Sequence, residues 1–180
     1  MRAEILSIGT ELLLGQILDT NAQYLAGRLA ALGIDLLHIS TVGDNLTRCR
    51  QAVERALTRS DLVVCTGGLG PTEDDLTREA IAAALGEDPA VDDDLARQLG
   101  EWFAGRGQPM PERNRKQAWL IPSARAIPNP NGTAPGWDVR RGATRIVAMP
   151  GVPREMTYMW ERHIEPTLIP DAVRSGGHFW

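Results

Sequence analysis

The sequence predicts an α/β fold built on a predominantly parallel β-sheet with helices on both faces. Apolar segments at 3–8, 34–42 and 62–65 are each followed by a segment with the periodicity of an amphipathic helix. The segment 62–65 is apolar and mostly β-branched, which is typical of a strand buried on both sides in a parallel sheet. Strands and helices that alternate in this way are joined by right-handed crossovers.

The first two strands lead into helices whose boundaries carry capping signals. After the first strand, the apolar stretch Leu12–Leu14 is closed by Gly15, and we expect it to be too short for a helix of its own. Asp19–Asn21 supplies N-cap residues for a helix that ends at Leu32. A turn follows the second strand, and Thr47 begins the next helix or lies just inside it.

The central strand runs into a glycine-rich turn, Thr66–Pro71. Its glycines permit positive φ and let a ligand approach bare N–H groups, as in many phosphate sites. We expect Thr72 to cap a helix over 74–85, with Asp75 at the capping-box spacing. The acidic residues at 73–75 would repel a phosphate unless a cation lies between them, but they also suit the helix dipole without any ligand.

The segment 86–122 interrupts the α/β rhythm and is predicted to be a helical insertion. It contains an amphipathic helix over 91–103, a loop at 105–109 and a short helix that starts at Pro111. The short helix carries the chain's one lysine, Lys116, among 19 cationic residues. Because every other cationic residue of the chain is Arg, the lysine at this position suggests a need for a compact ammonium group, such as one held over a phosphate. A solvated cationic face is the alternative.

The last third of the chain returns to strands and closes with a helix. Pro150–Pro153 resembles the glycine-rich turn in its position, because it follows a strand and precedes a helix that ends near His163. The elements expected before it are a strand at 124–127, a turn-dense loop at 129–136 and a hairpin with strands at 137–140 and 144–149.

Several polar or glycine-rich segments directly follow predicted strands. They are Glu11, Asp44, 67–75 and 150–153. Because ligands of parallel sheets gather at the carboxyl ends of the strands, we expect these segments to converge at one edge of the sheet.

The composition excludes several classes of partner. The net charge of −4 argues against an extended surface that binds nucleic acid. A polyanionic ligand would therefore have to be bound by a local group of residues. No run approaches the length needed to span a membrane, and no signal-type N-terminus is present. Cys49 and Cys65 fall in a helical and a strand pattern and are expected to be buried, reduced thiols. We expect a cytoplasmic protein with neither a nucleic-acid nor a membrane partner.

Six motifs together resemble the N-terminal domain of the competence/damage-inducible protein CinA family. The resemblance runs from Ile5 to about Pro170, so we assign 1–170 to one domain and 171–180 to the start of a linker to a following domain absent here. The motifs are Ser7–Gln16, Asp19–Asn21, Thr66–Thr72 with Asp74-Asp75, Asn114–Ala118, Asn129–Gly136 and Met149–Met156.

The resemblance implies a three-layer α/β/α fold, similar to molybdopterin-binding domains, with a helical insertion. CinA-type N-terminal domains are associated with metal-dependent ADP-ribose pyrophosphatase activity, which gives AMP and ribose 5-phosphate. Full-length relatives carry a separate nicotinamide-nucleotide amidase domain, which this chain lacks, so deamidation is not assigned. The sequence differs from the related adenylyl-transferring proteins at 69–74, after the glycine pair.

We expect Asp44, Asp75 and Lys116 to be catalytic, with a divalent ion of the Mg, Mn or Co class on Asp44, Asp74 and Asp75. The metal would neutralise phosphate oxygens, and Lys116 would offset developing negative charge. Histidines lie outside the motifs, so a zinc site of imidazoles is not indicated. The expected substrate-binding residues are Gly9, Thr10, Glu11, Asn21, Thr66, Gly67, Gly68, Gly70, Thr72, Asn131, Gly132, Thr133, Pro150 and Gly151.

Three functions remain open: a nucleotide pyrophosphatase, a molybdopterin or nucleotide adenylyltransferase, and a binding or assembly module whose chemistry lies in another domain. In each case the partner is a small nucleotide-like molecule. Trp102, Phe103, Trp119 and Trp137 lie in or near the insertion, and aromatic residues are enriched in interfaces. They predict a homo-oligomer, a dimer or trimer, unless they form a local mini-core instead.

Overall fold

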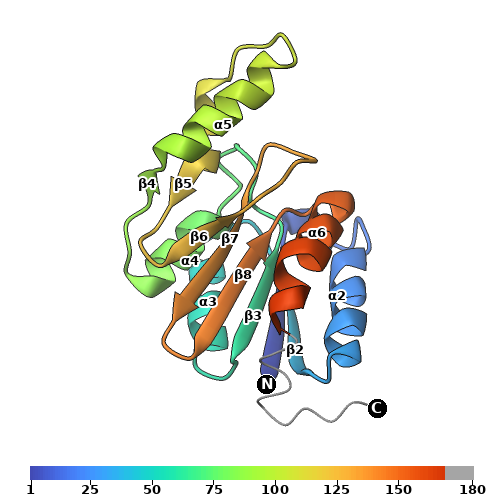
Figure 1. The fold of residues 1–180 in the computed structure, drawn as a ribbon. Coiled ribbons are helices and arrows are strands. Elements are labelled where there is room, and N and C mark those ends of the chain that lie inside the picture. Colours follow the sequence, from blue (N-terminus) through green and yellow to red (C-terminus); the bar gives the residue numbers. More distant parts are fainter. Residues whose placement is uncertain (169–180) are drawn as a thin grey trace.

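A computed structural model describes residues 1–168 and contains a mostly parallel six-stranded sheet (Figure 1). The strand order is β2-β1-β3-β8-β7-β6, and β7 alone runs antiparallel to both of its neighbours. The predicted α/β class is therefore confirmed. The strands are β1 (Arg2–Ile8), β2 (Asp35–Val42), β3 (Leu62–Thr66), β6 (Ala124–Ile127), β7 (Gly136–Arg141) and β8 (Thr144–Met149).

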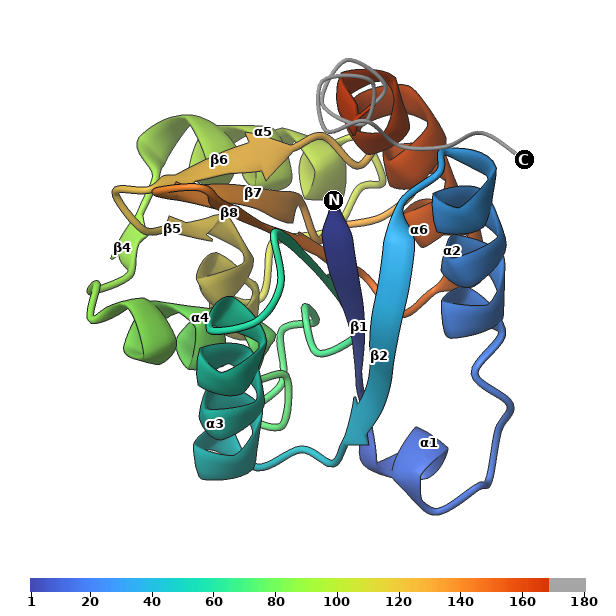
Figure 2. The same cartoon turned by 90° about the horizontal axis from the view of Figure 1, so that it is seen from below.

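Two helical layers cover the sheet, as Figure 2 shows from below. Successive side chains of the central strands point to opposite faces, so Ile5 and Val64 pack in one core cluster and Leu6 and Val63 in the other. Both clusters are closed to solvent, which explains why these strands are mostly apolar on both faces. The first core is covered by α2 (Thr20–Ala31), α6 (Pro153–Met159) and its π-helical continuation η2 (Trp160–Ile164), and the second by α3 (Leu46–Leu57) and α4 (Thr77–Leu85).

The predicted insertion is present and forms its own small layer. It contains α5 (Asp93–Ala104), the 3₁₀-helix η1 (Glu112–Ala118) and a two-stranded antiparallel ladder of β4 (Ala90–Val91) and β5 (Trp119–Leu120). The carboxylate of Asp92 caps α5 by accepting a 2.9 Å hydrogen bond from the N–H of Leu95. The ladder was not expected from the sequence, because two-residue strands carry no periodicity.

Two helix starts differ from the prediction. A single helical turn, α1 (Thr10–Leu13), forms where we expected none, and Asp44 accepts a 2.9 Å hydrogen bond from the first N–H of this turn. Helix α4 begins at Thr77 rather than Asp74, and Thr72 is not its N-cap. The Thr77 hydroxyl donates to the carbonyl of Gly67 at 2.7 Å, so the first residue of α4 holds the glycine-rich turn.

The aromatic residues that predicted an assembly surface are largely used within the chain. Trp137 is fully buried, and its indole N–H donates to the carbonyl of Trp119 at 2.9 Å. Phe103 is also buried. These contacts support a local core, and a homo-oligomer stays a prediction. Cys49 and Cys65 are buried, free thiols as expected. Within residues 1–168, no helix has the length and apolarity to cross a membrane.

The predicted linker at 171–180 lies outside the described residues.

Candidate functional site

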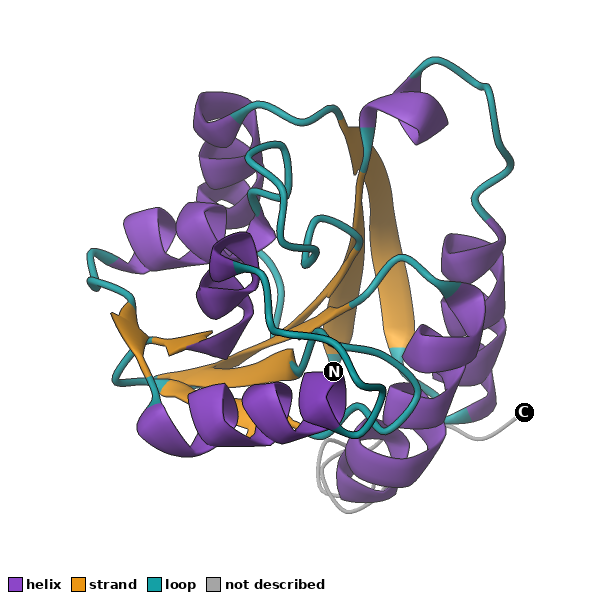
Figure 3. Cartoon of the chain, turned by 90° about the horizontal axis from the view of Figure 1, so that it is seen from above, coloured by secondary structure: helices purple, strands orange, loops and turns teal. Residues whose placement is uncertain are grey.

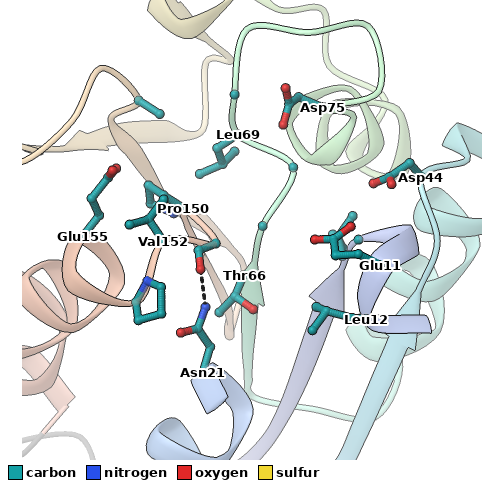
Figure 4. Close-up of a pocket in the computed structure, with 18 of the residues that line it drawn as sticks. Glu11, Leu12, Asn21, Asp44, Thr66, Leu69, Asp75, Pro150, Val152 and Glu155 are labelled. Carbon is teal, nitrogen blue, oxygen red and sulfur yellow. Dashed lines mark hydrogen bonds between the residues drawn. The ribbon is translucent and has the colours of Figure 1, made fainter. Parts of the chain in front are cut away.

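A cavity of about 520 Å³ opens at the carboxyl ends of the parallel strands. Figure 3 shows the loops that gather there, above the sheet, and Figure 4 shows the side chains that line the cavity. The four segments predicted to converge therefore do so. The predicted site residues that line it are Gly9, Glu11, Asn21, Asp44, Thr66, Gly67, Gly68, Gly70, Asp74, Asp75, Thr133, Pro150 and Gly151.

The glycine-rich turn requires glycine at its first position for two separate reasons. Gly67 has φ 90°, and a Cβ there would lie 2.2 Å from the carbonyl oxygen of Ile8. Gly68 also has positive φ, and a Cβ would lie 2.4 Å from the hydroxyl oxygen of Thr77. The turn therefore lies close against β1 and α4, and it presents backbone rather than side chains to the cavity.

The cavity is strongly acidic. Among the described residues, its lining includes six carboxylates and no Lys, Arg or His side chain. In Figure 4, Glu11 and Asp44 lie on one side of the glycine-rich turn and Glu155 on the other, with Asp75 above the turn. A bare phosphate would be repelled here, so an anionic ligand needs an accompanying cation. The six are Glu11, Asp19, Asp44, Asp74, Asp75 and Glu155.

Asp44 and Asp75 are both oriented by hydrogen bonds from backbone N–H groups. Asp75 accepts from the backbone N–H of Thr72 at 2.9 Å and from its hydroxyl at 2.5 Å. Asp44 accepts from the N–H of Thr10, and the Thr10 hydroxyl accepts from the N–H of Asp44 at 3.0 Å. Thr10 and Thr72, both predicted ligand contacts, therefore support carboxylates that line the cavity and do not line it themselves.

The side chains do not form a complete metal site on their own. Within residues 1–168, no group of three or more His, Cys, Asp or Glu side chains converges in a way that would hold a metal ion. The predicted set Asp44, Asp74 and Asp75 lines one cavity but is not such a group. A protein-only cage for a divalent ion is therefore not the arrangement seen here.

Lys116 does not line the cavity, and its ammonium contacts the segment between the glycine-rich turn and α4. Its ammonium donates to the carbonyl oxygens of Thr72 at 2.9 Å and Asp75 at 2.7 Å, and it lies 2.8 Å from a carboxylate oxygen of Glu79. These three contacts match the three protons of an ammonium group. Lys116 thus connects the insertion to the segment that follows the glycine-rich turn. Two other predicted site residues, Asn131 and Gly132, also lie outside the lining of this cavity.

A fully buried arginine joins the two loops that flank the cavity. Arg78 donates to the carbonyl of Leu69 at 2.8 Å and to that of Pro135 at 3.1 Å. Burial lowers the pKa of Arg78 to about 10, with Glu79 and Asp75 acting in the opposite direction, so the guanidinium remains charged at neutral pH. The burial of Arg78 was not predicted, because an arginine in a helix pattern gives no signal of burial.

Other residues of the site were also missed. Glu155 accepts a 2.6 Å hydrogen bond from the amide of Asn129, and a Cβ at Gly132 would lie 2.4 Å from a Glu155 carboxylate oxygen. Its position two residues after Pro153, at the start of α6, was the available signal. Asn21 was predicted, and its amide donates to the carbonyl of Gly151 at 2.8 Å, the dashed line in Figure 4.

Comparison with known proteins places the chain in a described family. Residues 4–169 match the family described as "Probable molybdopterin binding domain". A CinA-like protein of Deinococcus deserti is 58% identical over 92% of this chain and 42% of its own length. A CinA-like protein of Thermomicrobium roseum is 55% identical over 94% of the chain and 42% of its own length. The chain thus spans less than half of these curated relatives.

Solved structures agree with this placement. The crystal structure of the protein CinA from Thermoplasma acidophilum is similar with a TM-score of 0.84 and 35% identity, covering 95% of this chain and 97% of that one. The molybdopterin biosynthesis enzyme MoaB of Thermus thermophilus has a TM-score of 0.62 at 21% identity, covering 99% of each chain, and shows the shared fold. The chain is a member of the molybdopterin-binding domain family, and it corresponds to the CinA-like branch of that family.

Proposed function

We propose that this domain binds a phosphorylated heterocyclic compound, a nucleotide or a molybdopterin-type molecule, in the acidic cavity. The observation that carries the proposal is the glycine-rich turn, which lines the cavity at Gly67, Gly68 and Gly70. The N–H of Gly67 donates to the carbonyl of Met149 at 3.0 Å, so the N–H groups that a ligand would meet are those of Gly68–Gly70. Bare N–H groups beside a helix start are a general means of holding a phosphate. Membership of the molybdopterin-binding family and the structural similarity to the molybdopterin biosynthesis enzyme MoaB support this class of ligand.

The acidic lining supports a divalent cation that arrives with the ligand. Mg²⁺ is usually held by one or two carboxylates together with substrate phosphates, rather than by a cage of side chains. Asp44 and Asp75 are the carboxylates that we assign to this role, and backbone N–H groups already fix both of them. The ligand phosphate would then complete a coordination shell that the protein leaves open.

A second candidate function is hydrolysis of a nucleotide pyrophosphate, such as ADP-ribose to AMP and ribose 5-phosphate. The observation that favours it is that carboxylates lie on both sides of the glycine-rich turn, where a cation could neutralise two adjacent phosphates. A metal ion in such a site supplies charge neutralisation and an activated water. Lys116 would act by holding the turn in place rather than by touching the substrate.

Calorimetric titration of the chain with ADP-ribose, AMP and a pterin phosphate, each with and without Mg²⁺ or Mn²⁺, tests both candidates. Release of AMP is followed in the same samples. Mg²⁺-dependent binding without turnover supports a binding domain, and AMP release supports the hydrolase. If none of the three compounds binds, both candidate functions are contradicted.

A matched pair of glycine variants localises the binding. A Cβ at Gly70 would lie 2.4 Å from the Asp75 carboxylate, whereas a Cβ at Gly100 in α5 meets nothing within 4 Å. Gly70→Ala is expected to weaken binding, and Gly100→Ala to leave it unchanged. Equal ligand affinities of the two variants would show that the ligand does not bind at the glycine-rich turn.

A further inference from the structure

A second cavity, of about 550 Å³, adjoins the first on the side of the insertion. It lies between α5, the loop before β7 and the helix that follows β8. Unlike the first cavity, its lining contains no carboxylate among the described residues. Its walls are mainly apolar and aromatic, and they include Leu95, Leu99, Trp102, Pro128, Pro130 and Tyr158.

The two cavities share part of their walls. Gln117 and Thr133 line both, so a ligand that passes between these residues would contact the two cavities at once. Gln117 is buried, and its side-chain oxygen accepts a 2.8 Å hydrogen bond from the amide of Asn114. This boundary is therefore built from a fixed side chain rather than a mobile one.

The aromatic wall is held in place before any ligand arrives. The guanidinium carbon of Arg106 lies 3.4 Å from the centre of the Trp102 ring, and Arg106 also donates to the Trp102 carbonyl at 3.0 Å. Phe103 contacts the same ring edge-on, with centroids 5.1 Å apart. Trp102 thus offers a fixed indole to the cavity at little entropic cost.

Two polar atoms of this lining are left without partners. Within residues 1–168, the indole nitrogen of Trp102 and the Nε2 atom of His163 are shielded from solvent and make no hydrogen bond. Buried polar groups of this kind are normally satisfied, so each one calls for an explanation. Because neither nitrogen is open to solvent, hydrogen bonds to them would require these side chains to move, whereas the apolar and aromatic walls already offer a surface for the flat face of a ring.

We propose that the second cavity receives the planar heteroaromatic ring of the ligand whose phosphate lies on the glycine-rich turn. This inference rests on the proposed function and extends it, because it assigns the two ends of one ligand to two cavities of opposite character. The ring is a purine or a pterin, which share a flat face and edge nitrogens. The acidic cavity holds the phosphate with its cation, and the insertion recognises the ring.

A pair of neighbouring variants on α5 tests the assignment. Gln98 is exposed at the mouth of the second cavity, so Gln98→Trp places bulk there, while Arg97 is exposed but does not line it. Gln98→Trp is expected to weaken ADP-ribose binding by about tenfold, a loss within the usual range for base stacking, and to leave ribose 5-phosphate binding unchanged. Arg97→Trp should alter neither. Equal affinity of wild type and Gln98→Trp for ADP-ribose would overturn the proposal.

The indole N–H signal of Trp102 in a ¹⁵N NMR spectrum, assigned with Trp102→Phe, gives a readout that does not depend on the phosphate. AMP, a pterin phosphate and adenosine are added in separate arms. A shift with AMP alone, with the pterin alone or with both supports the proposal and identifies the ring. If adenosine moves the signal while ribose 5-phosphate binds nowhere, the ring site stands and the proposed phosphate site fails. If phosphorylated ligands bind in a Gly70-dependent way and no ring compound moves the signal, the second cavity is not the ring site.

Discussion

The ammonium of Lys116 lies 2.8 Å from the carboxylate of Glu79, in the helix that follows the turn that we propose to hold a phosphate. Two further bonds run from this ammonium to the carbonyls of Thr72 and Asp75. The insertion is thus joined to the edge of the acidic cavity by one largely buried side chain. The predictions below follow from this arrangement and from the geometry of the cavity.

Replacing Lys116 should lower the stability of the fold and, as a consequence, weaken ligand binding in the acidic cavity. Lys116→Met removes three hydrogen-bond donors and leaves Glu79 without its cation, so we expect a loss of about 2–4 kcal/mol in the free energy of unfolding. Ligand affinity should fall with it. Lys116→Arg should restore part of the stability but not all of it, because a planar guanidinium cannot point donors at three converging oxygens. Urea denaturation with parallel ligand titration measures both. A Lys116→Met protein of wild-type stability would show that these contacts are not made.

The charge of Asp75 should have opposite effects with and without a cation. Asp75→Asn keeps an acceptor for the N–H of Thr72 but removes one negative charge from the cavity. We expect binding of a phosphorylated ligand with Mg²⁺, and any turnover, to be lost or strongly reduced. Without divalent ions, the same variant should bind the phosphate more tightly than the wild type, because a repulsion has been removed. A residue that only orders the turn would show the same change under both conditions.

The glycine at the start of the turn should be intolerant of any side chain. Gly67→Ala meets both a positive φ and a Cβ contact of 2.2 Å with backbone, and we expect it to reduce the free energy of unfolding by about 2–4 kcal/mol. Gly27 in α2 has open space around its Cβ position, so Gly27→Ala should instead add about 0.5–1 kcal/mol. Thermal unfolding of the two proteins compares them directly. Similar stabilities would contradict the geometry of the turn.

An ion pair remote from the cavity gives a pH-dependent prediction. A hydrogen bond from the Arg2 side chain, together with one from its backbone N–H, holds the pKa of Asp61 below its ordinary value of 3.8. A carboxyl group whose pKa is lower in the folded state stabilises the fold above that ordinary value, and this contribution is lost as the pH falls through the lowered pKa. Because both groups are partly exposed, Asp61→Asn should cost only about 0.5–1 kcal/mol at pH 7. In denaturation series from pH 7 to pH 2, the difference from wild type should vanish at the acidic end, and a constant difference would refute the assignment.

The sheet and the position of the site could be predicted because they depend on local pattern. Apolar runs such as Leu62–Thr66 report burial on both faces directly, and loops after parallel strands must share one edge. The direction of the Lys116 side chain could not be predicted, since it depends on how the insertion packs against the turn. The start of α4 shifted for a similar reason, because Thr77 is held by the carbonyl of Gly67, ten residues earlier in the chain.

The charged groups of the site show the same division. Asp44 and Asp75 follow strands and carry a visible signal, and both line the cavity. Arg78 and Glu155 act through contacts with a loop more than 20 residues away in sequence, so no spacing rule identifies them. The acidic lining of the cavity was predictable from the acidic residues beside the glycines, whereas the absence of a complete three-ligand group within the described residues required coordinates.

The most direct test of the central claim is a crystal structure of the chain with ADP-ribose and Mg²⁺. We predict a phosphate within hydrogen-bonding distance of the backbone N–H groups at Gly68–Gly70, with the cation between that phosphate and the carboxylates of Asp44 or Asp75. A ligand bound elsewhere, with the glycine-rich turn and its carboxylates making no contact to phosphate or cation, would contradict the account.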